Sequence, residues 1–190
     1  MEIKGSYLLP CDPQRAWEAL NDPDLLKSCL KGCERLEKVA DNNFEGTVQA
    51  KVGPVSARFN GSLTQTDINA PNRCTMVFEG QGGVAGFAKG SADVTLDEAD
   101  GGTLLSYAAG AQIGGKLAQM GARLVEGTAR SMAEDFFSKF SAALAAEHGE
   151  ASVIATAPEQ ATVSTEGGSN RAWLVIGAVL AALLVIYWLV

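Results

Sequence analysis

Residues able to perform acid–base, nucleophilic or metal chemistry are few in this chain. It has one histidine, His148, and four cysteines, of which Cys29 and Cys33 are spaced C-x3-C in the segment CLKGC. A zinc site needs further thiolate or imidazole ligands, and none accompanies this pair. We therefore expect no metal site and no catalytic set, and we expect Cys11, Cys29, Cys33 and Cys74 to be reduced, buried or half-buried thiols.

Two other patterns resemble functional motifs without their context. The glycine-rich segment EGQGGVAGFAKG at 79–90 lacks the Lys-Ser/Thr of a phosphate-binding loop, and it joins two expected strands rather than opening a helix. We expect a flexible hairpin beside a pocket. The acids Glu45, Glu79 and Asp93 alternate onto the polar face of their strands, so a paired-carboxylate site has no support.

The segments that must position any site alternate between apolar and polar residues. Period two recurs in 44–52, 55–63, 74–80, 88–96 and 105–113. A period of two with one polar face predicts an antiparallel sheet that is covered on one side. Before these segments come a short strand, EIKGSYLLP, and two short helices, DPQRAWEALND and PDLLKSCL, each with an aspartate or proline near its start.

After Gly115 the period becomes helical. Residues 116–147 predict one long amphipathic helix whose apolar stripe consists of Leu117, Gly121, Leu124, Val125, Thr128, Met132, Phe136 and Phe140. The order of strand, two helices, about six strands and long helix predicts an α+β helix-grip fold, in which a curved antiparallel sheet wraps one C-terminal helix.

Many inward-facing positions of the expected sheet are glycine or alanine. Such a sheet either keeps an apolar pocket beneath the helix or uses its small residues for close helix–sheet approach, and both alternatives stay open. The candidate pocket residues are Phe59, Met76, Phe78, Gly83, Phe87, Tyr107, Leu117, Met120, Gly121, Leu124, Met132 and Phe136.

The C-terminal segment predicts a membrane anchor. Residues 172–190 contain no charged residue and no Asn, Gln, Ser or Thr, and a helix of this length spans about 28 Å, close to the bilayer hydrocarbon. Trp173, Tyr187 and Trp188 occupy positions typical of interfacial aromatics, and Arg171 favours a cytoplasmic domain. We expect a domain at 1–146, a flexible linker at 147–170 and a transmembrane helix at 171–190.

The net charge of −7 argues against a nucleic-acid partner and against an electrostatic hold on anionic lipid. By this reasoning, attachment to the cytoplasmic membrane depends on the C-terminal segment.

Several stretches make the chain resemble the family of the carbon monoxide dehydrogenase G subunit (CoxG), within the START-like superfamily. They are CLKGCE at 29–34, VGPVSARFNG at 52–61, FEGQGGVAGFAKGSADVTL at 78–96, IGGKLAQMGARL at 113–124 and FFSKF at 136–140. The resemblance implies an accessory protein of a molybdenum carbon monoxide dehydrogenase or a related hydroxylase. It also implies that the protein recruits the enzyme to the cytoplasmic membrane and binds a respiratory quinone, ubiquinone or menaquinone, in an apolar cavity. Electrons would then pass to the quinone pool.

The leading hypothesis is thus a membrane-anchored quinone-binding accessory protein without a covalent cofactor. The alternative is a purely structural membrane adaptor or assembly factor with no bound ligand. A START-like enzyme is a third hypothesis, and it would need an acid–base pair inside the cavity that the sequence does not supply.

Overall fold

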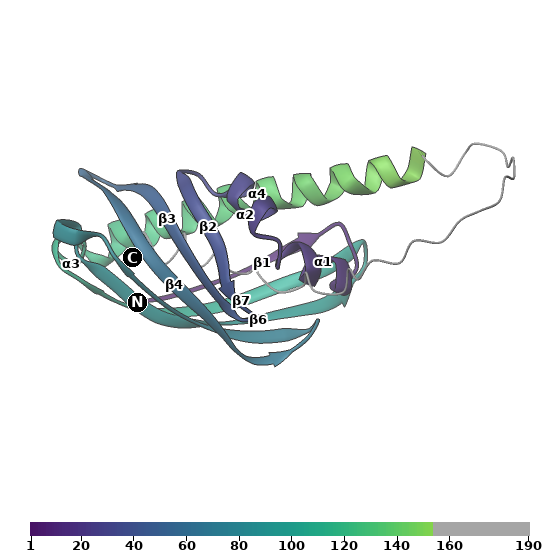
Figure 1. Ribbon diagram of the computed structural model, residues 1–190, viewed down its shortest axis with the longest axis horizontal. Helices are drawn as coiled ribbons and strands as arrows, with labels where there is room; N and C mark the ends of the chain where they lie inside the picture. Colours follow the sequence, from purple (N-terminus) through teal and green to yellow (C-terminus); the bar gives the residue numbers. More distant parts are fainter. Residues whose placement is uncertain (154–190) are drawn as a thin grey trace, which may run out of the picture.

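The computed structural model describes residues 1–153, with side chains for residues 1–147, as one curved sheet and four helices (Figure 1). Its elements in chain order are β1 (Glu2–Leu9), α1 (Pro13–Ala19), α2 (Pro23–Cys29), β2 (Cys33–Ala40), β3 (Asn43–Val52), β4 (Val55–Asn69), β5 (Arg73–Gln81), the 3₁₀ turn η1 (Gly83–Ala85), β6 (Phe87–Ala99), β7 (Gly102–Gly114), α3 (Lys116–Gln119) and α4 (Ala122–Val153). This order confirms the predicted α+β arrangement.

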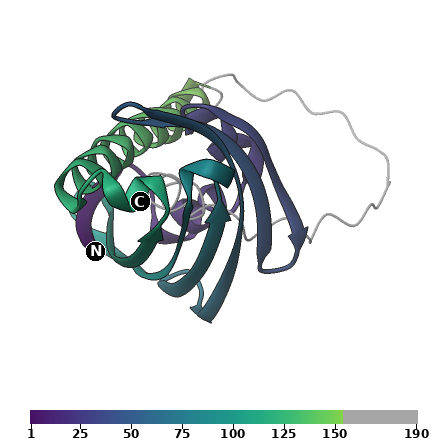
Figure 2. The same cartoon turned by 90° about the vertical axis from the view of Figure 1, so that its left-hand side faces the viewer.

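The sheet has seven strands in the order β1-β7-β6-β5-β4-β3-β2, and each neighbouring pair is antiparallel. Because β2 to β7 follow one another as hairpins, their connections alternate between the two ends of the sheet. The turn 53–54, the loop 82–86 and the segment 114–121 lie at one end, here called the α3 end. The turns 41–42, 70–72 and 100–101 lie at the opposite end. Figure 2 looks onto the α3 end and shows the sheet wrapping as an open half-barrel with α4 across its open side.

Buried and exposed residues alternate along the strands as predicted. In β3 and β5 every second residue is buried, whereas Glu45, Glu79 and Asp93 are exposed on the helix-free face. The side chains of one strand face therefore form the core with α4, and the acids lie outside it.

On the inward face of the sheet, residues paired across neighbouring strands form rows, and the side-chain volume changes abruptly between two adjacent rows. Phe44, Leu63 and Phe78 face one another across β3, β4 and β5. One row nearer the α3 end, the paired residues are Gly46, Gly61 and Gly80. This second row contributes no side-chain volume to the space between sheet and helix.

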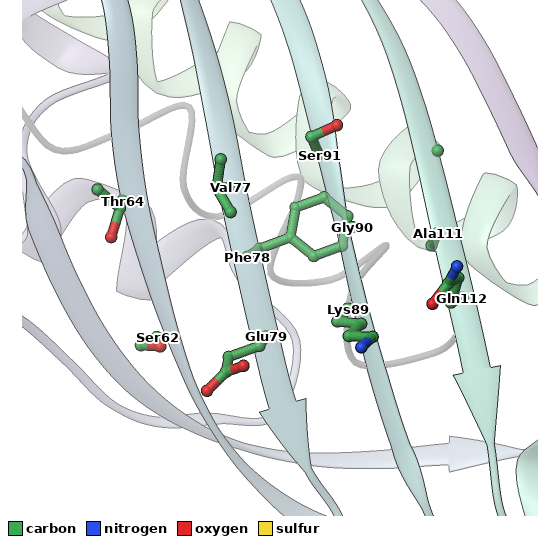
Figure 3. Close-up of a pocket in the computed structure, with 11 residues that line it drawn as sticks. Ser62, Thr64, Val77, Phe78, Glu79, Lys89, Gly90, Ser91, Ala111 and Gln112 are labelled. Atoms are coloured by element: carbon green, nitrogen blue, oxygen red, sulfur yellow. The ribbon is translucent and has the colours of Figure 1, made fainter.

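The backbones of β6 and β7 approach each other closely at Gly90. A Cβ atom at Gly90 would lie 2.0 Å from the carbonyl oxygen of Gly110, so only glycine permits this approach. The ring of Phe78 reaches toward Gly90 from the neighbouring strand (Figure 3). An aromatic ring opposite a strand glycine supplies contact area that the glycine lacks.

Both short helices begin at an aspartate cap. The Asp12 carboxylate accepts a hydrogen bond from the Arg15 amide at 3.0 Å, and that of Asp22 accepts from the Asp24 amide at 2.9 Å. Such caps satisfy amides that lack intrahelical partners. The buried side chains of Trp17 and Leu26 then join these helices to the core.

The expectation of one continuous helix from residue 116 was wrong. Helix α3 ends at Gln119 and α4 begins at Ala122, and Gly121 between them has φ +87°. Residues with side chains rarely adopt this left-handed conformation, so the glycine marks the break.

The buried face of α4 is also rotated relative to the predicted stripe. Leu124 is 42% exposed, and Thr128 and Met132 are only partly buried. The buried residues are Val125, Ala129, Ala133, Phe136, Phe137, Phe140 and Leu144. The small Ala129 and Ala133 let the helix approach the sheet closely, which moves the larger neighbouring residues to the flank.

The tail predictions fall largely outside the described part of the chain. Helix α4 continues to Val153, past the linker boundary expected at 147. The rest of that linker and the segment 171–190 with Trp173, Tyr187 and Trp188 lie beyond the described residues. Within residues 1–153, no helix has the length and apolar character needed to span a bilayer.

The rotated face of α4 predicts which side chains stabilise the fold. Phe136→Ala should lower the free energy of unfolding by about 3–5 kcal/mol, because a fully buried ring leaves a cavity. Leu124→Ala, on the predicted but exposed position, should cost less than about 1 kcal/mol. Urea denaturation followed by circular dichroism measures both. Equal losses for the two variants would contradict the observed orientation of the helix.

An apolar groove at the α3 end as candidate functional site

An apolar groove of ≈ 530 Å³ lies between the end of β7, helix α3 and the first turn of α4. Its lining side chains are apolar apart from the Gln112 amide, and the part-buried Met1 ammonium lies at one side. The lining residues are Met1, Phe87, Ala111, Gln112, Ile113, Leu117, Ala118, Gly121, Ala122 and Val125. The volume falls within the range of about 300–1,000 Å³ that is typical of small-molecule sites.

The N-terminus forms one side of the groove. The Met1 ammonium donates to the Ala111 carbonyl at 3.0 Å, and the Ala111 amide donates to the Met1 carbonyl at 3.0 Å. These two bonds extend the β1–β7 pairing to the first residue. The Met1 side chain thereby becomes part of the lining.

Phe87 and the turn after β7 form another side. A Cβ atom at Gly114 would lie 2.2 Å from the Phe87 ring, so the ring lies directly on the backbone of that turn. A Cβ atom at Gly115 would lie 2.5 Å from the Gly86 Cα atom. The loop 82–86 and the start of α3 therefore pack backbone to backbone, which fixes the ring at the groove.

Two further apolar side chains lie on the opposite flank of α4. A Cβ atom at Gly53 would lie 3.0 Å from Leu124 and 3.5 Å from Met120. Leu124 and Met120 thus reach the β3–β4 turn. They form a rim of the α3 end rather than the groove itself.

Loop 82–86 packs directly against the ring of Phe59. A Cβ atom at Gly82 would lie 2.1 Å from that buried ring. Gly83, with φ +59°, and the 85% exposed Val84 form the tip of the loop. The glycine-rich segment is therefore a short hairpin connection supported from below, in agreement with the prediction that it joins two strands.

The structure brings together only part of the predicted pocket set. Phe87, Leu117 and Gly121 line the groove. Phe59, Gly83, Met120 and Leu124 belong to the surrounding rim. Met76, Phe78, Tyr107 and Phe136 are buried at 7% exposure or less in the main core, and Met132 packs partly buried against it.

Tyr107 is held in an aromatic stack instead of facing the groove. Its ring lies 6.4 Å from Tyr7 and 6.0 Å from Phe137, and Tyr7 lies 4.0 Å from Phe137, centroid to centroid. Burial, together with the neighbouring Tyr7 phenol, raises the pKa of Tyr107 well above its usual range. A neutral stacked phenol suits a structural role at the seam between β1 and α4.

Sequence reasoning missed several lining residues. Ala111, Ile113 and Val125 were on inward or apolar positions but too common in type to single out. Met1, Ala118 and Ala122 carried no periodic signal, because their location depends on the terminal strand pairing and on the helix break at Gly121.

A second hollow, of ≈ 650 Å³, lies on the helix-free face across β4 to β7 (Figure 3). Its side chains are mainly polar, with Glu79 opposite Lys89 in the strand register and Ser62, Thr64 and Ser91 around them. A polar trough of this kind does not suit an apolar ligand. The groove at the α3 end is the better candidate.

Comparison with known families decides the classification. The family model for the G subunit of carbon monoxide dehydrogenase (CoxG) matches residues 5–145, which include every strand except the first residues of β1. This chain belongs to the CoxG family. The groove residues of β7, α3 and α4 lie inside the matched range. No curated protein matches the chain.

Solved structures support the same fold for this CoxG-family chain. A conserved protein from Geobacillus kaustophilus is 29% identical, with a TM-score of 0.71, over 76% of this chain and 95% of that one. Proteins from Rhizobium leguminosarum and Thermus thermophilus are 16% and 18% identical, with TM-scores of 0.58 and 0.56. They cover 76% and 77% of this chain and 93% and 99% of their own. At these identities the latter two show the fold alone.

The cysteines of this CoxG-family chain are free thiols, as predicted. Cys11, Cys29 and Cys74 are buried and Cys33 is partly buried. Burial raises the pKa of Cys11 to about 11 and that of Cys74 to about 12, and it raises the pKa values of Cys29 and Cys33 as well. Among residues 1–147, no three His, Cys, Asp or Glu side chains gather closely enough to hold a metal ion.

These burial differences predict thiol reactivity. At pH 8 a thiol-exchange reagent should modify Cys33 at least about tenfold faster than Cys11, Cys29 and Cys74, because the reactive thiolate is scarce and shielded at the buried positions. Release of the coloured leaving group measures the rate. Cys33→Ser should remove the fast phase. Uniform reaction of all four thiols in the native protein would contradict the structure.

Proposed function

We propose that this chain is an accessory protein of a molybdenum carbon monoxide dehydrogenase or related hydroxylase, and that it carries a respiratory quinone in the groove at the α3 end. The family assignment supports the association with carbon monoxide dehydrogenase. The observation that carries the ligand proposal is the hydrocarbon lining of the groove. Its position beside three loops gives a ligand direct access from one end of the domain.

The chemistry of the lining suits a prenylated ring. Phe87 offers an aromatic face, and Leu117 and Val125 offer aliphatic contacts for isoprenoid units. The Gln112 amide can donate a hydrogen bond to a quinone carbonyl. Ubiquinone and menaquinone both combine such a carbonyl with an apolar chain, so the groove accommodates either class.

The free energies of transfer favour reversible binding of the quinone over permanent retention. Removing a prenyl chain from water is favourable by about 25 cal/mol per Å² of apolar surface. Transfer from lipid gains almost none of this energy, because lipid tails are already apolar. A ligand can therefore be loaded from a membrane and returned to it.

A binding protein fits the groove better than an enzyme. The lining side chains are apolar apart from the Gln112 amide, and the Met1 ammonium, the one titratable group of the lining, is held by the Ala111 carbonyl, so the groove offers no acid–base pair. Glu45, Glu79 and Asp93 are exposed on the other face of the sheet.

Membrane attachment is the second part of the proposal. The apolar segment 171–190 would be a single-pass anchor in the cytoplasmic membrane, with the domain on the cytoplasmic side and residues after α4 as the tether. Recruitment of the dehydrogenase would then place its electrons near the quinone pool.

One observation favours the alternative, a structural adaptor or assembly factor without a ligand. Met76, Tyr107 and Phe136 of the predicted lining are packed in the core instead of facing a cavity. If the groove stays empty in the cell, the adaptor function is the better account.

Filling the groove tests the proposal. Ala118 and Ala122 line the groove yet are exposed, so Ala118→Leu with Ala122→Leu adds volume there without overpacking the core. The full chain, purified from a respiring host and extracted with solvent, should release close to one quinone per protein. The double variant should release at least about tenfold less, equivalent to about 1.4 kcal/mol of binding free energy.

Ala142→Leu is the matched control, because Ala142 is an exposed alanine of α4 outside the groove. It should retain the quinone. A chain that carries no quinone and still recruits the dehydrogenase to membranes would favour the adaptor function.

A further inference from the structure

Exposed apolar side chains lie on and beside the loops of the α3 end. Val84 is 85% exposed, Leu124 42% and Phe87 39%. Pro54 is exposed on the β3–β4 turn, and Met120 lies half-buried beside it. All three loops face the viewer in Figure 2. Leu8, Val39 and Leu104 are exposed toward the opposite end as well, so apolar exposure marks an interaction surface at the α3 end only together with the charge around it.

The same end is free of acidic residues over long stretches of sequence. Residues 46–62, 80–92 and 108–125 contain no Asp or Glu but contain Lys51, Arg58, Lys89, Lys116 and Arg123. Arg58 pairs with Glu34 at 2.8 Å. The other four are exposed, and none of them takes part in an ion pair within the described part of the chain.

Acids that border the α3 end are balanced by basic neighbours. Glu2 pairs with Lys4 at 2.7 Å, and Glu126 pairs with Arg130 at 2.9 Å. Glu79 lies opposite Lys89 in the strand register. The end as a whole is therefore positive.

The turns at the opposite end of the sheet are acidic. Asp41 lies in the turn 41–42, Asp67 precedes the turn 70–72, and Asp97, Glu98 and Asp100 precede or form the turn 100–101. The net charge of −7 thus conceals a separation of charge along the domain. The expectation that the chain has no electrostatic attraction to anionic lipid rested on the net charge alone.

We propose that the α3 end is a docking surface for an anionic lipid bilayer. Val84, Leu124 and Phe87 insert between the headgroups, and Lys51, Lys116 and Arg123 contact lipid phosphates around them. Apolar tips ringed by unpaired cations match an interface that is anionic at its surface and apolar beneath. The acidic opposite end is repelled by the same surface, which orients the domain.

Docking in this orientation places the groove next to the bilayer, because Phe87 belongs to both the groove lining and the proposed docking surface. The surface argument does not use a ligand, and it holds whether or not the groove binds quinone. It also adds a contact that is separate from the apolar segment 171–190.

Site-specific fluorescence on the full chain separates docking from attachment through that segment. Val84→Cys and Val39→Cys, each in a Cys33→Ser background, carry an environment-sensitive fluorophore at opposite ends of the sheet. Val39 is the matched control, because it is a 53% exposed valine next to the turn 41–42. On vesicles of phosphatidylglycerol and phosphatidylcholine, the label at 84 should brighten at least about threefold and be quenched by lipid-borne quenchers. The label at 39 should behave as in water.

Charge variants test the electrostatic half of the proposal. Lys51→Gln with Lys116→Gln and Arg123→Gln should remove most of the roughly threefold brightening at 84 at physiological salt, as should high salt with the unchanged chain. A control variant replaces Lys38 and Arg73, which lie toward the opposite end, with Gln; it removes two cations, of which Arg73 lies 3.8 Å from Asp93, and should leave the signal unchanged.

Three results would overturn the proposal. They are a bound protein whose label at 84 stays in water, equal signals from 84 and 39, and equal signals on anionic and purely zwitterionic vesicles. A label at 84 that is shielded only when the dehydrogenase is added would assign the surface to a protein partner instead. Quinone extraction from the same preparations is scored independently, so failure of docking and failure of ligand binding are distinguishable.

Discussion

The structure depends on how seven strands bury one face with a single long helix. Aromatic and branched residues complete that packing over most of the sheet, as in the row of Phe44, Leu63 and Phe78, which is buried in the same core as Phe136 and Phe140. One row closer to the α3 end, three glycines replace them. The next row toward that end is filled again by the buried Val48 and Phe59. The apolar groove lies at the same end but is lined by the N-terminus, Phe87 and residues of β7, α3 and α4.

Strand topology gathers the remaining features at the same end. Each antiparallel hairpin reverses the chain, so the β3–β4 turn, the loop 82–86 and the segment after β7 must meet there. The helix break at Gly121 turns α3 across this end, and the pairing of Met1 with Ala111 brings the N-terminus to it. A groove, apolar loop tips and unpaired cations are consequently neighbours although they are far apart in the sequence. The proposed ligand access and the proposed membrane contact would then be properties of one surface.

The sequence predicted the sheet well and the site incompletely. Period-two alternation in β3 to β7 identified both faces, because each strand has one buried and one wet side. The aspartate caps of α1 and α2 were equally local signals. The prediction of one continuous long helix was wrong at Gly121, because a glycine inside an apolar stripe cannot be distinguished from a packing residue until its φ angle is known. Leu124 was then predicted to be inward although it is exposed, and Met132 packs only partly buried against the core, because the alanines that fix the rotation of α4 carry a weak apolar signal.

Net charge was the least informative property of the sequence. Its value of −7 is correct for the chain, yet the charges separate along the axis of the domain. That separation depends on which turns share an end, which only the topology reveals. Tyr107 also depends on tertiary contacts. The alternation along its strand predicted that it faces inward and lines a pocket, whereas its stack with Tyr7 and Phe137 places it between the sheet and the helix.

The central claim is that the groove at the α3 end holds the quinone. Photolabelling of the full chain in membranes with an azidoquinone, followed by peptide mapping, tests it most directly. The account predicts label in residues 111–125 and at Phe87, with competition by unmodified quinone. Label on the polar trough around Ser62, Glu79 and Ser91, or label that excess quinone does not displace, would contradict it.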